Sequence, residues 1–442
     1  MSTQPSLAGV AEHFTPERRR YIVGGWTANM LATYDLFLPV VVLPAALSYF
    51  EPPNLPAVVQ VTVVNITYLI SILASPIGGL VLAPLGDRLG RRTLVIIGGA
   101  GYALVSLLIA LLPGYASWGY GAIAALLILR FIGSALNGTT VGGSVALALE
   151  WTPKSWRGLV GGLMGVSPTV GVILTSAVQL IALSIWHGPL FETVGWRFPF
   201  YVGAFLGVLL LATVLRSMRD VEFFEQHAGK ARAPLREVFS RFNLKTFGQA
   251  FMLYTGYLFA IQVSVVFLPP LLIAYLHQPP PMVTSLLLYG NLGILVGGVV
   301  MGALSQRIGR RRGLMIGGAW VAVLATLCYY LMVQSAAAKA GEALVTFWGF
   351  WVVALSVIPY SAMVLTYLAE RYPIHIRATG FTAVITLANI IPGFSSFYII
   401  GLSKIMPYQY AALVLVVVAG LLTLIGALMG PETRDVDMVA SS

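Results

Sequence analysis

The sequence predicts an all-α membrane protein with twelve transmembrane helices, arranged as two pseudo-symmetric six-helix bundles. Of its 442 residues, 58% are hydrophobic and only 10% are charged, whereas a soluble domain carries about 25% charged residues. The apolar residues form long uninterrupted runs, which excludes the alternating pattern of an outer-membrane barrel. One set of motifs also occurs twice along the chain, which indicates a duplicated half.

The apolar runs have the length of membrane spans, because a helix needs about 20 apolar residues to cross the hydrocarbon core. Twelve such segments follow one another, at 20–48, 57–84, 92–112, 119–149, 156–186, 195–217, 245–276, 282–306, 312–335, 342–370, 377–403 and 406–430. We therefore expect twelve helices joined by polar connections.

The positive charges are distributed unevenly between the two sets of connections. The chain has 26 Lys and Arg and a net charge of +10. All but four of these bases lie at the N-terminus or in connections on the same side, the exceptions being Arg130, Arg197, Lys339 and Lys404. This asymmetry predicts a multi-pass protein of the plasma (cytoplasmic) membrane with both termini in the cytoplasm. Topology thus accounts for the basic charge. We expect the chain to interact with the lipid bilayer and not with nucleic acid.

Two pairs of motifs reveal an internal repeat. The stretch "GGLVLAPLGDRLGRRTLVIIGGA" (78–100) matches "GGVVMGALSQRIGRRRGLMIGGA" (297–319), and "EWTPKSWRG" (150–158) matches "ERYPIHIRATG" (370–380), at offsets of 219 and 220 residues. Such parallel repeats are known in transporters, with the binding site between the halves. We predict an N-terminal bundle at 1–217, a charged cytoplasmic linker at 218–244 and a C-terminal bundle at 245–442.

These motifs resemble those of the major facilitator superfamily. "GDRLGRR" (86–92) is similar to its signature between the second and third helices, and "RFIGSALNG" (130–138) to its fourth-helix pattern. Further stretches, "GWRFPF" (195–200) and "YDLF" (34–37), resemble metabolite–proton and phosphate–proton symporters, with sugar porters and aromatic acid–proton symporters as relatives. The chain departs from the metabolite and phosphate groups at Ser144, where they carry an acid. The resemblance implies a transporter that works by alternating access.

One acid and one base lie deep inside the predicted spans. Asp35 is in the first and Arg130 in the fourth. A lone charge at membrane depth is costly, so such residues are usually functional and usually paired. We expect Asp35 and Arg130 to pair and to couple proton and substrate, as the resemblance also implies. The alternative is a permanent salt bridge that only locks the two helices together.

The charged cytoplasmic motifs predict an intracellular gate. Glycine allows helix ends to approach closely, and the acids of one motif can pair with the arginines of another. The predicted gate residues are Gly86, Asp87, Arg88, Gly90, Arg91, Arg92, Glu150, Arg157, Arg307, Arg310, Glu370 and Arg377. Gln306 replaces Asp87 in the second half, so we expect an asymmetric gate. The bland alternative is that these arginines only enforce topology.

Polar and tyrosine side chains inside the spans are candidates for holding the substrate. Together with Arg130, they are Tyr34, Ser134, Asn137, Tyr254, Tyr257, Gln262, Asn291, Tyr360 and Asn389. For any one of these residues, a hydrogen bond between helices is an equally good explanation, and for the tyrosines core packing is the favoured one. Pro168 and Pro392 are expected to break the fifth and eleventh helices and to provide bending points.

The functional hypothesis is a proton-coupled symporter of a small organic anion, a carboxylate. The alternatives are a proton-coupled antiporter that exports drugs or metabolites, supported by "GVSPTVG" (165–171), and a facilitator of neutral sugars. We expect a monomer without enzymatic activity, because no span holds a catalytic constellation. No metal and no cofactor other than the proton is expected: the histidines are scattered and Cys328 is the single cysteine.

Overall fold

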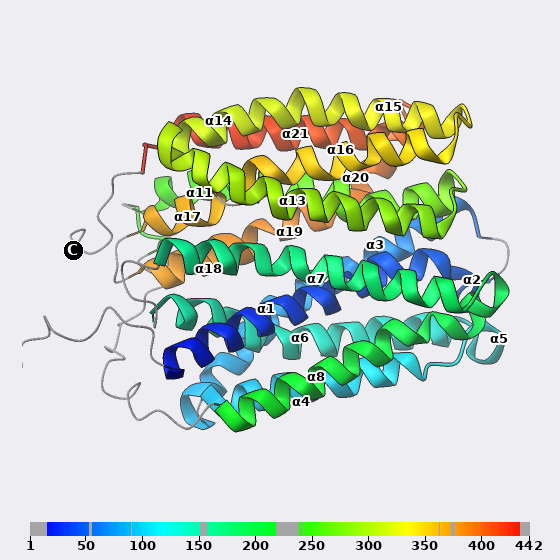
Figure 1. Ribbon diagram of the computed structural model, residues 1–442, viewed down its shortest axis with the longest axis horizontal. Coiled ribbons are helices and arrows are strands. Elements are labelled where there is room, and N and C mark those ends of the chain that lie inside the picture. Colours follow the sequence, from blue (N-terminus) through cyan, green and yellow to red (C-terminus); the bar gives the residue numbers. More distant parts are fainter. Residues whose placement is uncertain are drawn as a thin grey trace, which may run out of the picture.

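The apolar runs fold into long helices that lie side by side along one axis (Figure 1). The computed structural model describes residues 16–52, 55–89, 91–150, 157–217, 238–241, 243–361, 363–372 and 376–433. Within these ranges the regular elements are all helical. A helix satisfies its backbone hydrogen bonds internally, which lipid requires of any spanning segment.

The described residues of the first half form six long helices and four short ones. They are α1 (Pro16–Val42), η2 (Leu43–Ala45), α2 (Leu47–Phe50), α3 (Ala57–Leu89), α4 (Arg91–Ala110), α5 (Tyr115–Trp118), α6 (Tyr120–Glu150), α7 (Arg157–Ile185), η4 (Phe191–Gly195) and α8 (Arg197–Ser217).

The described residues of the second half form the same number of spans, but several of these spans are built from consecutive helical pieces. They are α11 (Leu244–Ile261), η5 (Gln262–Phe267), α12 (Leu268–Pro270), η6 (Leu271–Tyr275), α13 (Pro280–Ile308), α14 (Arg310–Trp320), η7 (Val321–Ala325), α15 (Thr326–Ala337), α16 (Glu342–Ser361), α17 (Val364–Glu370), α18 (Arg377–Ala388), α19 (Ile390–Gly393), α20 (Ser395–Leu402) and α21 (Tyr408–Met429).

The predicted spans correspond one by one to these helices. Among the described residues, eleven helices are long and apolar enough to cross a membrane, and α4 supplies the remaining span with a shorter apolar stretch, Ile96–Ala110. The all-helical fold and its twelve-span organisation are thus confirmed. The predicted linker falls largely on residues 218–237, which lie outside the described ranges, so the domain boundaries stay a prediction.

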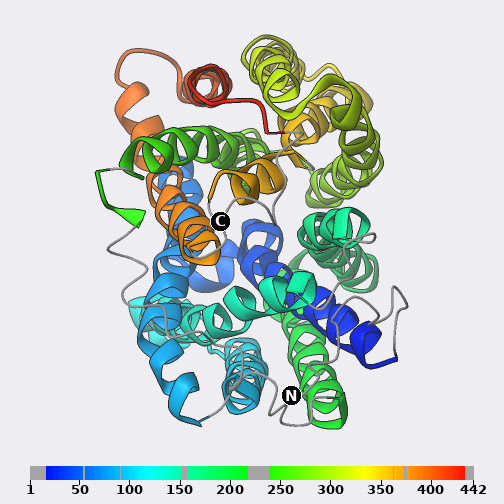
Figure 2. The ribbon, with the colours of Figure 1, turned by 90° about the vertical axis from the view of Figure 1, so that its left-hand side faces the viewer.

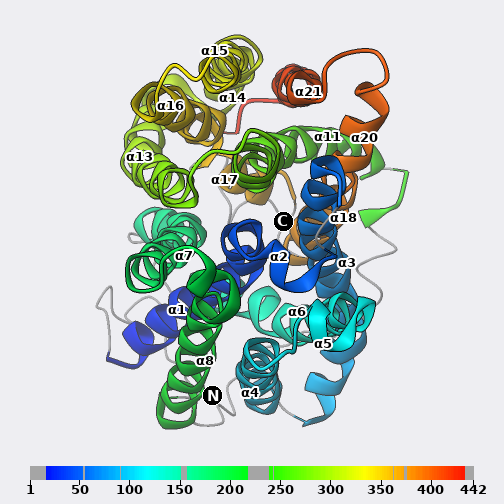
Figure 3. The ribbon, with the colours of Figure 1, turned by 90° about the vertical axis from the view of Figure 1, so that its right-hand side faces the viewer.

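Seen end-on, the helices form two groups, one for each half of the chain (Figures 2 and 3). Following the predicted topology, we call the end that carries α2 and α5 the outer end and the opposite end, where α1 begins, the inner end. The two halves pack along α7 and α13. In addition, α3 contacts η6, α19 and α20, and α1 contacts η5 and α12. These partners belong to the outer halves of their spans, so the outer side is closed.

One of the two expected helix breaks does not occur. Pro392 interrupts its span, which continues as α19 and α20, but Pro168 lies inside the unbroken helix α7. A proline leaves the carbonyl four residues earlier without its backbone donor, which here is that of Met164. The Ser167 hydroxyl donates to this carbonyl at 2.8 Å. Ser167 thereby replaces the lost hydrogen bond, and α7 stays continuous.

Candidate substrate and proton site

The predicted pair is formed in the centre of the first half. The Arg130 Nη1 atom lies 2.7 Å from the Asp35 Oδ1 atom. Arg130 is 1% and Asp35 4% exposed. The Arg130 Nη2 atom also donates to the backbone carbonyl of Asp35 at 2.9 Å and to the Ser71 hydroxyl at 3.1 Å. Helices α1, α3 and α6 therefore meet at one guanidinium group.

A proline explains why the Asp35 carbonyl is available. Pro39 lies inside α1, four residues after Asp35, so the usual backbone donor to that carbonyl is missing. The Arg130 guanidinium fills the vacant position. Sequence reasoning missed both Pro39 and Ser71, although the four-residue spacing from Asp35 to Pro39 was a readable signal.

Several polar atoms beside the pair have no partner in the described part of the chain. They include the Arg130 Nε atom, the Ser134 hydroxyl on the next turn of α6 and the Tyr102 hydroxyl of α4. Tyr102 interacts electrostatically with both Asp35 and Arg130. Buried polar groups are normally hydrogen-bonded. These atoms can therefore form hydrogen bonds with a ligand that approaches the guanidinium.

Helix α1 is held firmly against α7 on the other side of the pair. The Asn29 side chain donates to Ser167 at 2.7 Å, and the Thr175 hydroxyl donates to the Tyr34 carbonyl at 3.3 Å. At Gly171 the two backbones approach so closely that a Cβ atom would overlap the Met30 carbonyl. These contacts hold the part of α1 that carries Asp35 in place.

The remaining first-half candidates make contacts within the protein. The Tyr34 hydroxyl donates to the Pro199 carbonyl at 2.7 Å, and Asn137 donates to the Ala32 carbonyl at 3.3 Å. Both bonds join helices, which is the alternative that the sequence left open. Their predicted role in substrate binding stays a prediction.

The candidates of the second half separate into amides and tyrosines. The Asn291 side chain donates to the Leu287 carbonyl of its own helix. Gln262 is buried, with its Nε2 atom unpartnered among the described residues, and Asn389 is half-buried at the break between α18 and α19. In contrast, Tyr257 contacts both Tyr254 and Tyr360, with ring centroids 5.5 and 5.8 Å apart. The structure thus gathers the tyrosines but leaves the amides apart.

Tyr68 of α3 joins this tyrosine group from the first half. It interacts electrostatically with Tyr254 and Tyr257, and its ring lies 5.6 Å from that of Phe37. Neither Tyr68 nor Phe37 could be selected from the sequence, because each is an ordinary aromatic residue within an apolar run.

The second-half gate has a member that the sequence analysis missed. Arg310 lies 3.7 Å from the Glu370 carboxylate. Glu432, which follows α21, accepts the backbone N–H groups of Arg310 at 2.7 Å and Arg311 at 3.1 Å. It caps the N-terminus of α14, where a negative charge is favourable. Thr433 adds a hydrogen bond to Glu370 at 2.6 Å.

Gly309 and Glu370 show the local constraints at this gate. Gly309 has φ +97°, and a Cβ atom there would overlap the Glu432 carboxylate, so glycine is required on both counts. Burial raises the pKa of Glu370, while the Thr433 hydroxyl and the Arg310 guanidinium oppose this shift. Arg307 lies in the last turn of α13.

The first-half gate falls mostly outside the described residues. Gly90 lies outside them, and so do the side chains of Asp87, Arg88, Arg91, Arg92, Glu150 and Arg157. The side chain of Arg377, a gate residue of the second half, also lies outside them. The backbone at Gly86 is part of α3. The pairing of these residues stays a prediction.

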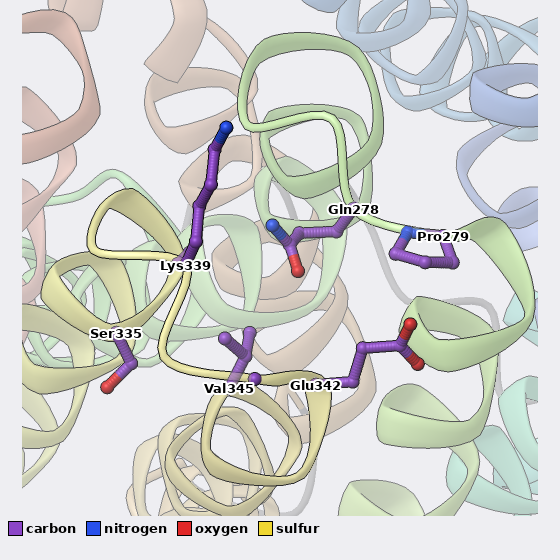
Figure 4. A pocket seen from close by; sticks show the side chains of 8 residues that line it. Gln278, Pro279, Ser335, Lys339, Glu342 and Val345 are labelled. Atoms are coloured by element: carbon purple, nitrogen blue, oxygen red, sulfur yellow. The ribbon is translucent and has the colours of Figure 1, made fainter.

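A separate pocket lies at the outer end of the second half (Figure 4). Its lining residues are Gln278, Pro279, Ser335, Ala336, Lys339, Gly341, Glu342 and Val345. The Lys339 side chain extends away from Glu342 (Figure 4). No residue of the predicted substrate site lines this pocket.

Comparison with known proteins identifies a family for this helical architecture. The family model of the Major Facilitator Superfamily matches residues 25–265. The proline/betaine transporter of Escherichia coli (strain K12) is 25% identical over 92% of this chain and 82% of its own, and the citrate-proton symporter of Salmonella typhi is 27% identical over 83% of each. The inner membrane metabolite transport protein YhjE of Escherichia coli (strain K12) is 27% identical over 96% of this chain and 97% of its own.

Among solved structures, a D-xylose-proton symporter superposes with a TM-score of 0.74 at 17% identity, over 94% of this chain and 98% of the other. At that identity the likeness shows the shared fold alone. The family match, the helical architecture and the paired charges lead to one conclusion: this chain belongs to the Major Facilitator Superfamily and is a membrane transport protein.

Proposed function

We propose that the chain is a secondary active transporter that carries a small organic carboxylate together with a proton by alternating access. The observation that carries the proposal is the buried bridge between Arg130 and Asp35, in which the guanidinium Nε atom has no partner among the described residues. The names of the relatives support it, since one is a citrate-proton symporter and another a proline/betaine transporter.

Protonation of Asp35 is the first step of the proposed mechanism. A proton on its carboxylate removes the charge that holds Arg130, whereas the guanidinium itself stays charged. An uncompensated cation in a site of low dielectric attracts an anion, and a carboxylate can bind a guanidinium through two parallel hydrogen bonds. Proton and anion thus load together without net charge. The loaded halves then reorient, and Asp35 recovers Arg130 after release.

Transport by purified protein in liposomes tests this mechanism. With a candidate carboxylate and an acidic medium outside, wild-type protein should accumulate the substrate as long as the proton gradient lasts. Asn at position 35 imitates the protonated acid permanently. We therefore expect Asp35→Asn to exchange substrate across the membrane but not to accumulate it. Glu342→Gln, an exposed acid at the outer end of α16, serves as the control and should accumulate substrate normally.

Arg130→Lys tests the binding half of the mechanism. Lysine keeps the charge but cannot contact Asp35 Oδ1, the Asp35 carbonyl and Ser71 with one planar group. We expect the substrate affinity to fall by about 10- to 100-fold, the equivalent of one charge-assisted hydrogen bond.

Three outcomes would contradict the proposal. Normal accumulation by Asp35→Asn would exclude proton coupling through this acid. Substrate efflux driven by proton influx would favour the exporter, and saturable uptake of a neutral sugar without proton dependence would favour the facilitator.

A further inference from the structure

An acid without a partner is buried at the outer end of the first half. Glu51 directly follows α2 and is 2% exposed, and neither of its carboxylate oxygens has a hydrogen-bond partner in the described part of the chain. The segment that leads to it contributes Leu43, Leu47 and Phe50 to the apolar core. An ionised carboxylate without a partner is costly in such surroundings. In this structure Glu51 is therefore a neutral acid.

The acids and tyrosines of the neighbouring elements do not stabilise Glu51. Helix α2 packs against η4, α5 and α6. On η4, Glu192 accepts a hydrogen bond from the Ser48 hydroxyl. Tyr115 of α5 and Tyr120 at the start of α6 contact each other, with ring centroids 5.4 Å apart. Burial, and not a neighbouring charge, raises the pKa of Glu51.

The arginines of this region have other partners. Arg197, at the start of α8, donates to the Tyr49 hydroxyl at 2.6 Å. Its guanidinium carbon lies 4.8 Å from the ring centroid of Tyr49 and 4.7 Å from that of Trp196. Arg130 of α6 belongs to the charged pair at the centre of the first half. A proton is therefore the group that neutralises Glu51.

The segment that carries Glu51 connects the two halves at their outer ends. Its first part, η2, contacts α3 of the first half and η6 of the second. Its second part, α2, lies near the middle of this end (Figure 3), and the Glu51 N–H donates to the Leu47 carbonyl at 3.1 Å. Tyr275, the ionisable residue of η6, has its ring against that of Tyr408. A movement of η2 relative to η6 is thus passed on through α2 to Glu51.

We propose that Glu51 is a second proton-binding site, which binds a proton from the outside when the outer side closes and returns it to the outside when that side opens. The inference rests on the alternating access of the proposed function, but neither on Asp35 nor on the substrate. Opening moves η2 away from η6, which draws α2 off α5 and α6 and admits water to the carboxyl group.

The Glu51 proton enters and leaves on the same side, so it is not transported. It sets the balance between the two states instead. The closed state requires the protonated acid, whereas the open state also accepts the hydrated carboxylate. By linkage, an acidic medium outside favours closure and an alkaline medium favours opening.

The distance between two spin labels, one on each half, tests the proposal. Ser117 of α5 and Ile405, which follows α20, are exposed at the outer ends of the two halves. Each can carry a labelled cysteine once Cys328, the only native cysteine, is replaced by serine. The distance is measured by electron–electron double resonance on the full chain in liposomes without substrate. Between about pH 5 and about pH 8, we expect the ratio of open to closed molecules to rise about tenfold or more.

Variants of the acids assign this pH dependence to Glu51. Glu51→Gln is neutral at every pH, so its labels should stay at the closed distance throughout. Glu51→Asp retains a carboxyl group and should keep the dependence. Asp35→Asn removes the acid of the charged pair and should keep it as well. Glu342→Gln, at an exposed acid of the outer end of α16, is the control and should behave like wild type.

The possible results separate this inference from the function on which it rests. An unchanged pH dependence in Glu51→Gln, or its absence from wild type, would overturn the Glu51 site. A Glu51→Gln variant that is open at every pH would also overturn it, because a neutral side chain should favour closure. Loss of the dependence in Asp35→Asn but not in Glu51→Gln would assign the response to Asp35 instead. Opening that follows pH in a protein that accumulates no carboxylate would overturn the symport and leave the Glu51 site intact.

Discussion

At the scale of single residues, Glu51 is a buried acid that the proposed mechanism does not use. It follows α2 at the outer end, is 2% exposed, and neither carboxylate oxygen has a hydrogen-bond partner among the described residues. Two charged residues of the outer end have other partners: Glu192 accepts a hydrogen bond from Ser48, and Arg197 donates to Tyr49. Burial without a partner disfavours the charged form, which raises the pKa of Glu51 to about 7.

The raised pKa of Glu51 predicts how stability depends on pH. Because the folded state binds this proton more tightly than the unfolded chain, whose pKa is about 4.5, the contribution is fully present below about 4.5 and is lost as pH rises through about 7. We expect Glu51→Gln to raise the midpoint of thermal unfolding above pH 7 and to leave it nearly unchanged in acid. The exposed Glu342→Gln is the control. An identical pH dependence in wild type and Glu51→Gln would contradict this assignment.

The residue scale also shows what the sequence could reveal of the site. Asp35 and Arg130 were predictable because a charge inside an apolar span is costly and therefore rare. Ser71 and Tyr68 were not, because a serine and a tyrosine in an apolar run are equally compatible with packing. Their importance depends on where α3 packs against α6 and against η5, and that packing is a property of the tertiary structure.

At the scale of elements, two prolines show how a helix uses a missing backbone donor. Pro168 leaves the Met164 carbonyl to the neighbouring Ser167 hydroxyl, so α7 is unbroken. Pro39 leaves the Asp35 carbonyl to Arg130 of another helix. The sequence shows that each proline frees a carbonyl, but which donor replaces the lost N–H depends on local rotamers and on helix packing. For this reason the break at Pro168 was predicted wrongly and the role of Pro39 was missed.

Pro39→Ala tests whether the freed carbonyl helps to hold Arg130. Alanine restores the backbone N–H, which competes with the Arg130 Nη2 atom for the Asp35 carbonyl. Loss of one hydrogen bond of about 1 kcal/mol lets a substrate capture the guanidinium more easily. Because a backbone carbonyl does not titrate, we expect the substrate affinity to rise about fivefold in acid as well as in alkaline medium, as measured by binding across pH.

Pro168→Ala is the matched control for Pro39→Ala, since it restores an N–H in α7 away from the charged pair. Its substrate affinity across pH should match that of wild type. An unchanged affinity in Pro39→Ala, or the same rise in both variants, would show that the Asp35 carbonyl does not hold Arg130.

The cap on α14 yields a second prediction for an element. Glu432 accepts two N–H groups at the start of α14, and loss of an N-cap acceptor costs about 1 kcal/mol. We expect Glu432→Ala to lower the midpoint of thermal unfolding and Glu432→Gln, which retains one acceptor, to lower it less. Thr433→Val removes only the neighbouring bond to Glu370 and should have a smaller effect than Glu432→Ala. An equal midpoint for Glu432→Ala and wild type would contradict the capping role.

At the scale of the whole molecule, the contacts between the halves indicate which side is closed. Gly393 of α19 faces Leu69 and Ile72 of α3, close to the level of Ser71. The contacts of α3 with η6 and α20 also involve the outer halves of their spans. The repeat in the sequence predicted the two bundles, because duplicated motifs preserve the order of helices. It could not predict which ends of the bundles touch, since this depends on the state of the transport cycle.

Gly393→Leu tests whether this contact closes the outer side. Already a Cβ atom at Gly393 would lie 2.7 Å from the Leu69 Cδ1 atom, so a whole leucine side chain must push α3 and α19 apart. We expect the variant to favour the state that is open to the outside. Asn65, buried two turns before Ile72 on α3, can carry a reporter cysteine once Cys328, the only native cysteine, is replaced by serine. A membrane-impermeant thiol reagent added outside should label Asn65→Cys several-fold faster in Gly393→Leu than without it.

Gly401→Leu is the control for the wedge, because no atom lies within 4 Å of a Cβ at this glycine of α20. It adds the same side chain to the same span without touching α3, so the labelling rate should stay at the level of the unaltered background. Faster labelling in both leucine variants would indicate general loosening of the span. An unchanged rate in Gly393→Leu would mean that the contact between α19 and α3 does not restrict access from outside, and that the closure depends on the packing of η6 against α3 instead.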